Sequence, residues 1–173
     1  MFKDIALFIK RFFMSSLNEP AYLIAGNYET RSYVSFDFAL SYYGLIPEAV
    51  YVCTSAIKSK KKRRFLRRGN KTFSYQHVPE VVFECGVNLM YENGISFRIA
   101  SPEKALCDKL FSMPQILTLR EMEYVLEDDL RIDMEALSKL NLRLIKKLSK
   151  LYSSKNVRVL AECLEKQRLC MKK

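Results

Sequence analysis

The segment around Asn93-Gly94 constrains the fold of this chain more than any other. Apolar and polar residues alternate on both sides of it, and an Asn-Gly pair between two such runs is a strong signal of a β-hairpin. The second run, Ile95–Ala100, passes directly into Ser101-Pro102-Glu103, which supplies an N-cap, a proline for the first helical position and an acid for the first turn. We therefore expect strands over Val81–Tyr91 and Ile95–Ala100, followed at once by a helix that ends before Pro114.

The residues before this hairpin predict one helix and three more strands. Ser35 is a good N-cap, Gly44 is suited to the αL position after a helix, and apolar residues recur between them at helical spacing. Residues 50–54, 64–66 and 72–78 have strand composition, and the turn residues of 68–71 join the last two into a second hairpin. Beyond Pro114 the pattern is helical, with leucines from Leu137 to Leu151 on one face.

This order of helices, strands and helices indicates an α+β fold, with N-terminal helices, a mostly antiparallel sheet of about four to six strands and a C-terminal helical bundle. A length of 173 residues fits about one domain. We divide the chain into an N-terminal helical segment, 1–30, and a domain over 31–173 whose helical part covers about 115–173. Residues 2–14 carry an apolar helical stripe that packs on its own domain or a partner, or else lies on a membrane; Pro20 and Gly26 are expected to end this segment.

Charge is distributed unevenly along the chain, although the net charge is +10. Residues 58–71 hold nine basic and no acidic side chains, and residues 139–173 hold eleven basic and two acidic ones. Between these two blocks, residues 72–138 carry twelve acidic and five basic side chains. Two interpretations stay open: the basic blocks bind a polyanion such as nucleic acid, or the acidic block faces them within the fold.

The basic run over 58–71 is the most specific chemical feature of the chain. If it forms a β-hairpin, its side chains project to both faces, so at least one basic face meets solvent or a partner. Binding of DNA or RNA along phosphates, or in a groove, would then depend strongly on salt. Such a run also resembles a nuclear localisation signal. The candidate nucleic-acid-binding residues are Lys58, Lys60, Lys61, Lys62, Arg63, Arg64, Arg67, Arg68 and Lys71.

The sequence offers little catalytic chemistry. His77 is the only histidine, and the five cysteines form no C-x-x-C pair, so we expect no zinc site, no other metal and no cofactor. There is no P-loop and no carboxylate-x-lysine pair of the kind that nucleases use, and the adjacent acids Glu127, Asp128 and Asp129 diverge around a helix. We therefore expect a protein that is not an enzyme. Reduced cysteines and the lack of a long apolar run favour a cytoplasmic protein that does not enter membranes.

Two segments together resemble the AbiEi antitoxins of type IV toxin–antitoxin systems, which act in bacterial abortive infection, a phage defence. The first is Tyr33-Val-Ser-Phe-Asp-Phe-Ala-Leu-Ser-Tyr-Tyr-Gly-Leu-Ile46, followed by Tyr51-Val52-Cys53-Thr54 and the basic run. The second, Ile99-Ala-Ser-Pro-Glu-Lys-Ala-Leu-Cys-Asp-Lys-Leu110, is similar to the I-A-S-P-E-K-A-L-x-D-x-L hallmark of that family. The similarity covers about residues 20–112, and the motif residues are Ser35, Ser41, Tyr43, Gly44, Ser101, Pro102, Glu103, Lys104 and Asp108.

This resemblance implies an antitoxin that counteracts a nucleotidyltransferase-like toxin, with antagonism that does not depend on a stable complex, and with autoregulation of transcription in many members. Those members read DNA with an N-terminal winged helix-turn-helix, and we expect the roughly 30 residues before the first motif here to be too few for one. Part of the second motif also has a purely structural explanation, because Ser101-Pro102-Glu103 is what a strand-to-helix junction needs. Lys104 and Asp108 stand one helical turn apart, and we expect them to pair on the surface.

Overall fold

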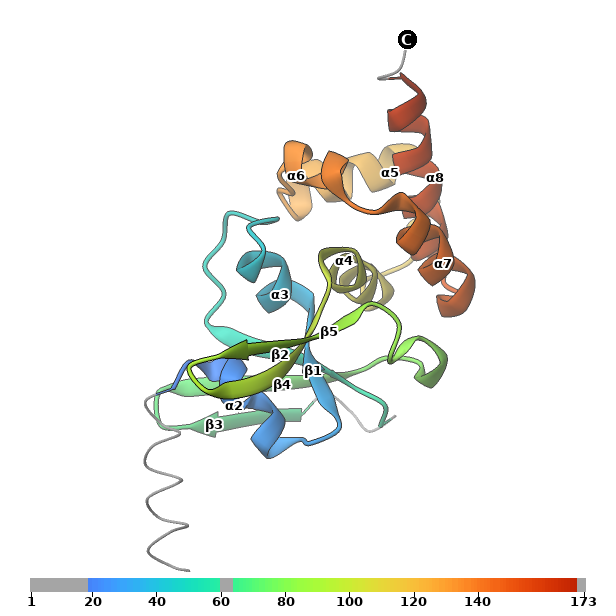
Figure 1. The fold of residues 1–173 in the computed structure, drawn as a ribbon. Helices are drawn as coiled ribbons and strands as arrows, with labels where there is room; N and C mark the ends of the chain where they lie inside the picture. Colours follow the sequence, from blue (N-terminus) through green and yellow to red (C-terminus); the bar gives the residue numbers. More distant parts are fainter. Residues whose placement is uncertain (1–18, 60–63, 171–173) are drawn as a thin grey trace, which may run out of the picture.

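The computed structural model describes residues 19–59 and 64–170 (Figure 1). Its centre is a six-stranded sheet in the order β3-β4-β2-β1-β6-β5. The strands are β1 (Ser32–Val34), β2 (Val52–Ile57), β3 (Arg64–Arg68), β4 (Lys71–His77), β5 (Val87–Glu92) and β6 (Ile95–Ala100). The helices are α2 (Ala21–Tyr28), α3 (Phe36–Tyr42), α4 (Pro102–Phe111), α5 (Leu119–Tyr124), α6 (Met134–Lys139), α7 (Leu142–Tyr152) and α8 (Lys155–Cys170), with a π-helical turn, η2, over Val125–Asp129.

The predicted α+β fold, with helices before and after a mostly antiparallel sheet, is confirmed. Antiparallel pairing joins β3 to β4, β1 to β2 and β5 to β6. The two remaining pairs, β2 with β4 and β1 with β6, are parallel, and both require the chain to cross over before it returns to the sheet. The β1–β6 pair brings the starts of α3 and α4, which follow these strands, to the same end of the sheet.

Helices cover both faces of the sheet (Figure 1). On one face α2 buries Leu23, Ile24 and Ala25, and the hydroxyl of Tyr75 in β4 donates to the carbonyl of Ala25 at 2.8 Å. On the other face lie α3 and α4, which an ion pair of 2.7 Å between Asp37 and Lys109 also connects. Apolar burial on both sides of the sheet is the main source of stability in such a layered fold.

The C-terminal helices stack beyond α4 rather than on the sheet (Figure 1). Buried Asn156 at the start of α8 fastens them to the loop after α4: its amide nitrogen donates to the carbonyls of Leu110 at 2.8 Å and Pro114 at 2.9 Å, and its oxygen accepts from the Ile116 amide at 2.8 Å. Because these backbone groups would otherwise be buried without partners, Asn156 fixes where the helical part begins.

The hairpin at Asn93-Gly94 is confirmed, since both residues have positive φ, 51° and 79°, as a two-residue type I′ turn requires. The predicted strand over Val81–Tyr91 is wrong in its first half. Residues Glu80–Val82 form a 3₁₀ turn after Pro79, and β5 starts only at Val87. Gly86 separates the two parts with a φ of 77°, which an extended strand cannot contain.

Three smaller expectations also need correction. Gly26 does not end the opening segment but lies inside α2. The first predicted strand of the middle region is displaced, because β2 runs over Val52–Ile57. The leucine face from Leu137 to Leu151 belongs to two helices, because Asn141 starts α7 by accepting from the amides of Arg143 and Leu144.

The predicted stripe of residues 2–14 lies outside the described residues. Across 19–59 and 64–170, no helix has both the length and the apolar character to cross a bilayer.

Candidate functional site

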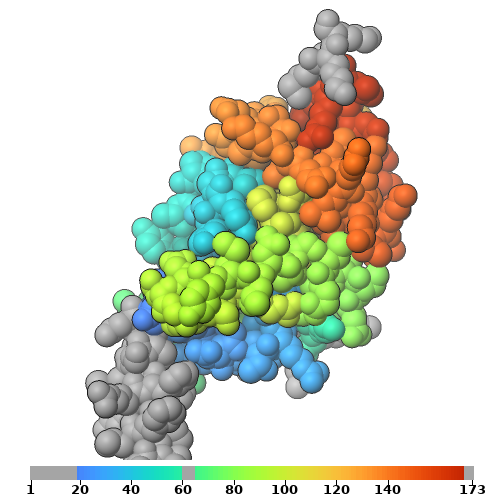
Figure 2. Space-filling model, viewed as in Figure 1, coloured from blue at the N-terminus to red at the C-terminus, as the bar shows by residue number. Residues whose placement is uncertain are grey.

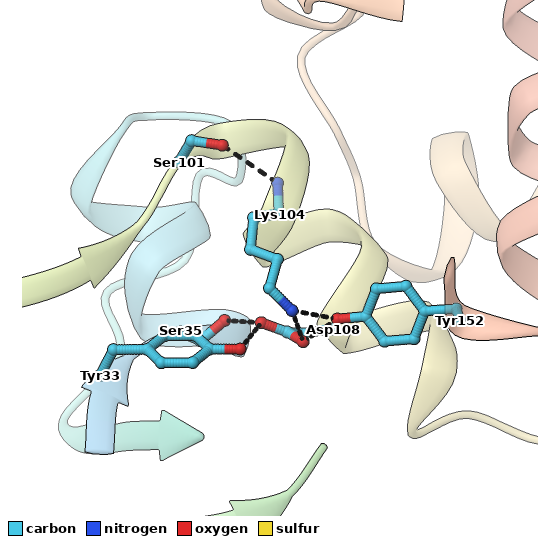
Figure 3. A network of polar contacts seen from close by, with 6 residues as sticks. All are labelled: Tyr33, Ser35, Ser101, Lys104, Asp108 and Tyr152. Carbon is cyan, nitrogen blue, oxygen red and sulfur yellow. Dashed lines mark hydrogen bonds and ion pairs between the residues drawn. The ribbon is translucent and has the colours of Figure 1, made fainter. Parts of the chain in front are cut away.

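The two motif segments meet in a buried polar cluster of five residues: Tyr33, Ser35, Lys104, Asp108 and Tyr152 (Figure 3). The Asp108 carboxylate in α4 is its centre and accepts four hydrogen bonds. One oxygen accepts from the hydroxyls of Ser35 at 2.6 Å and Tyr33 at 3.1 Å. The other accepts from the Lys104 ammonium at 2.9 Å and from the Tyr152 hydroxyl. The carboxylate therefore joins β1, α4 and α7.

Lys104 and Asp108 pair as their spacing predicts, but the expectation of a surface pair is wrong. The side chains of both residues are 0% exposed. Lys104 also donates to the Tyr152 hydroxyl, and its ammonium lies 4.6 Å from the centre of the Tyr152 ring and 5.4 Å from that of Tyr33. A buried charge pair is tolerated only when nearly all its hydrogen-bonding capacity is used, and the aromatic faces complete the surroundings of the cation.

Ser35 precedes α3 as predicted, but its hydroxyl does not cap the helix. Thr54 of β2 takes that role, because its oxygen accepts from the Phe38 amide at 3.1 Å while its hydroxyl donates to the Ser35 carbonyl at 2.5 Å. The Ser35 hydroxyl is thus left for Asp108. Phe36, the next residue, has a φ of 57°, a conformation that costs a bulky side chain about 1–3 kcal/mol. The surrounding packing holds this turn in the position that the cluster needs.

Ser101 is the N-cap of α4, as predicted, and its oxygen accepts from the Lys104 amide at 3.3 Å. Gly86 lies against the same turn, with its carbonyl accepting from the Ser101 amide at 2.7 Å. A Cβ on Gly86 would come within 3.1 Å of the Lys104 Cβ, and its φ of 77° also disfavours any other residue. The close approach of Gly86 helps to exclude water from Lys104.

Burial and the Asp108 charge act together on the two tyrosines of the cluster. Desolvation first, and then the neighbouring carboxylate, raise the pKa of Tyr33 and of Tyr152 well above the usual value for a phenol. Both hydroxyls therefore stay protonated and act as hydrogen-bond donors to Asp108. The cluster contains one cation and one anion, and its hydroxyl groups are neutral.

The other motif residues serve local structure. Gly44, with a φ of 68°, ends α3 in a Schellman motif in which the Gly44 amide bonds the Ser41 carbonyl and the Leu45 amide bonds the Leu40 carbonyl. The Ser41 hydroxyl donates to the Glu48 carbonyl at 2.8 Å, and Tyr43 is half-buried after α3. Pro102 opens α4, and Glu103 accepts from the Asn141 amide at 2.8 Å at the start of α7.

The predicted basic ribbon lies at one edge of the sheet. Arg64 begins the edge strand β3, Arg67 and Arg68 are exposed on it, and Lys71 begins β4. The Arg68 guanidinium lies 5.8 Å from the centre of the Tyr28 ring, and Lys58 pairs with the exposed carboxylate of Glu80 at 3.4 Å. The hairpin predicted at 68–71 is confirmed by the β3–β4 pairing. Lys60, Lys61, Lys62 and Arg63 lie outside the described residues.

Reasoning from sequence missed Tyr152 and left Tyr33 out of the site residues, although Tyr33 stands in the first motif. Tyr152 ends a leucine-rich helix more than forty residues after the motifs, and nothing in its neighbourhood marks it as a partner of Asp108. A tyrosine on an otherwise apolar face was the only available signal, because a buried phenol needs a hydrogen-bond acceptor.

Among the described residues, the remaining reactive groups do not form a second cluster. Burial raises the pKa of the Cys53 thiol to about 12 and that of the Cys107 thiol above its usual range, so neither is a ready nucleophile. His77 lies half-buried at the end of β4. Within the part of the chain that the structure describes, no group of three or more histidine, cysteine or acidic side chains is placed to hold a metal ion.

Comparison with known proteins adds no relative. No protein-family model matches the chain, and a search of curated proteins finds no match either. The family resemblance therefore depends on the two motifs and on the geometry that joins them.

Proposed function

We propose that the chain is a non-enzymatic antitoxin of the AbiEi type, which counteracts a nucleotidyltransferase-like toxin. The observation that carries the proposal is the contact between the two motifs: Ser35 of the first donates to Asp108 of the second at 2.6 Å, although 73 residues separate them. Each motif alone has a local explanation in helix capping. The hydrogen bond between them forms only when Ser35 and Asp108 are both present. We take this as support for common descent with the AbiEi family over two separate chance matches.

The burial of the cluster supports a structural role for the motif residues. Lys104 and Asp108 are fully buried, so a substrate cannot reach the ion pair without the domain opening. The cluster instead holds the sheet, α4 and α7 in one arrangement. On this proposal the surface that antagonises the toxin is presented by a rigid domain whose interior the motifs define.

Co-expression tests this function directly. The full chain is expressed together with the nucleotidyltransferase-like toxin encoded beside it, and growth is compared with cells that express the toxin alone. We expect growth to recover. A Ser35→Ala variant with Asp108→Asn weakens the domain, so recovery should fall with the amount of folded protein. A Glu135→Ala variant, changed on exposed α6, serves as the control. Continued growth arrest beside soluble, folded wild-type protein would contradict the proposal.

A second candidate function is a nucleic-acid-binding regulator, and the position of the basic run favours it. Arg67 and Arg68 are exposed on an edge strand, where a β-ribbon can follow phosphates or enter a groove. This function is compatible with the first, because an antitoxin can also regulate its own transcription. Binding of the full chain to duplex DNA and to RNA should weaken steeply between about 50 and 200 mM salt. Replacing Lys61, Arg63 and Arg67 by alanine should weaken it further, and an interaction that is absent or insensitive to salt removes this candidate.

A further inference from the structure

The strand β5 forms the edge of the sheet opposite to β3, and it is unusually apolar for an edge. Leu89 is 73% exposed, Tyr91 is 76% exposed and Met90 is 37% exposed. Figure 2 shows the hairpin that β5 forms with β6, coloured lime green, on the surface toward the viewer, with no other described part of the chain over it. Natural proteins normally protect an exposed edge with charges, proline or a bulge, because an open edge pairs with other strands.

The backbone of β5 is also prepared for pairing. Glu92 and Ile95 flank the two-residue turn, so they form a hydrogen-bonded pair, and such pairs alternate along an antiparallel ladder. Met90 and Asn88 therefore bond to β6, whereas the amide and carbonyl groups of Val87, Leu89 and Tyr91 point away from the sheet. Among the described strands, β5 pairs only with β6, so this outer row has no strand opposite it.

We propose that β5 is a self-association surface, on which a second copy of this chain pairs its own β5 in antiparallel orientation about a two-fold axis at Leu89. This axis places Leu89 opposite its own copy, Tyr91 opposite Val87, and Met90 opposite Asn88. The single charged residue of the strand, Glu92, then faces Gly86 of the other copy. No like charges oppose one another, and the exposed apolar side chains gain contacts across the axis.

Charge explains why a second copy pairs here and not at the other edge. The same two-fold operation at β3, centred on Arg67, sets the exposed Arg67 of each copy opposite that of the other, and like charges directly opposite destabilise a sheet. For a chain of net charge +10, the edge strand without basic residues is where two copies approach with least repulsion. Pairing at β5 leaves both basic β3 edges at the two outer ends of one continuous sheet.

The proposed dimer is weak. The six residues of β5 bury less surface than the roughly 800 Å² per partner of a standard interface. We therefore expect a dissociation constant in about the micromolar range. The proposal does not depend on the antitoxin or nucleic-acid function, since it concerns only how two copies meet.

Sedimentation equilibrium of the full chain over a range of concentrations tests the proposal. We expect a reversible monomer–dimer equilibrium. Leu89→Lys should raise the dissociation constant at least about tenfold, because two lysines then meet at the axis. Phe65→Lys on β3 is the matched control, since Phe65 is 63% exposed on the opposite edge and its replacement should leave the equilibrium unchanged.

A mixing experiment distinguishes loss of pairing from loss of folding. Leu89→Lys and Leu89→Glu chains, each weakly associating alone, should form a mixed dimer when combined, because the two-fold axis brings the opposite charges together. The proposal is overturned by a wild-type chain that stays monomeric up to about millimolar concentration, by a dimer that Leu89→Lys leaves intact, or by the absence of the mixed dimer. If β5 pairs instead with an extended strand of another protein, the wild-type chain alone stays monomeric, which is the first of these results.

Discussion

Charge has opposite roles in two regions of this molecule, the cluster around Asp108 and the basic edge strand β3. In the cluster, one cation and one anion are fully buried, and the anion accepts four hydrogen bonds. On β3, Arg67 and Arg68 are exposed to solvent. Burial costs each ion several kcal/mol unless its partners are in place, whereas an exposed ion costs almost nothing. Buried charge therefore fixes the position of the helices, and exposed charge remains available for a partner.

The largest expected effect comes from breaking the buried pair on one side. Asp108→Asn leaves the Lys104 ammonium buried without a counter-ion, which should lower the free energy of unfolding by about 3–5 kcal/mol. Chemical denaturation of the full chain measures this loss. Adding Lys104→Met to the first substitution should restore part of the stability, because the uncompensated charge is then gone. Additive losses in the double variant would show that the two charges are not coupled.

A single hydroxyl of the cluster has a smaller effect. Ser35→Ala removes a hydrogen bond to a charged acceptor, which is worth about 1.5–3 kcal/mol, and urea denaturation should show it. Ser41→Ala, in helix α3 that follows Ser35, is the matched control, since the Ser41 hydroxyl bonds only a carbonyl on the exposed side. The loss of unfolding free energy in Ser41→Ala should be less than half of that in Ser35→Ala. Equal losses of stability in the two variants would contradict the specific contribution of the Ser35–Asp108 hydrogen bond.

The pH dependence of stability should follow the buried phenols. Tyr33 and Tyr152 keep their protons in the folded state because their pKa values are raised, but in the unfolded chain they titrate near pH 10. Above about pH 10 the unfolded state binds fewer protons, so the free energy of unfolding should fall by up to about 1.4 kcal/mol per pH unit for each such group. Tyr152→Phe should make this fall less steep between pH 10 and 11, and an unchanged slope would contradict the assignment.

The smallest effect on stability is expected at β3. Arg67→Ala together with Arg68→Ala should change the free energy of unfolding by no more than about 0.5 kcal/mol, because both side chains are exposed. If the strand contacts phosphates, the same double variant should lower the slope of log K against log salt by about 1.8. Arg120→Ala with Arg131→Ala, two exposed arginines of the acidic helical region, is the control and should leave the slope unchanged. A loss of stability without a change in slope would assign β3 a structural role instead.

Local patterns predicted the elements of this fold well at turns and caps, where particular residue types favour one backbone conformation. Asn93-Gly94 and Gly44 adopt the positive φ values that their types favour, and Ser101-Pro102-Glu103 starts α4 as expected. The prediction of a strand failed for residues 81–86, which form a turn. Val82 and Phe83 are buried there, but they do not extend the sheet. Composition alone does not distinguish a buried turn from a buried strand.

The candidate site was predictable only in part. The spacing of Lys104 and Asp108 indicated their pairing, because residues four apart share a helical face. Their burial depended on Tyr33, Ser35 and Tyr152, which arrive from a strand, a loop and a distant helix. The role of Ser35 was missed for the same reason, since Thr54 of a neighbouring strand caps α3 in its place.

By itself, the sequence determined most turns, helices and strands of this chain. It also determined that the positive charge is concentrated in two blocks. These properties depend on residues within a few positions of one another. Only the tertiary structure decided that an ion pair on α4 would be sealed from water and that β3 and β5 would be the two edges of the sheet, one charged and one apolar. Burial and strand order depend on contacts between segments far apart in the chain, and local pattern carries no information on which segments will meet.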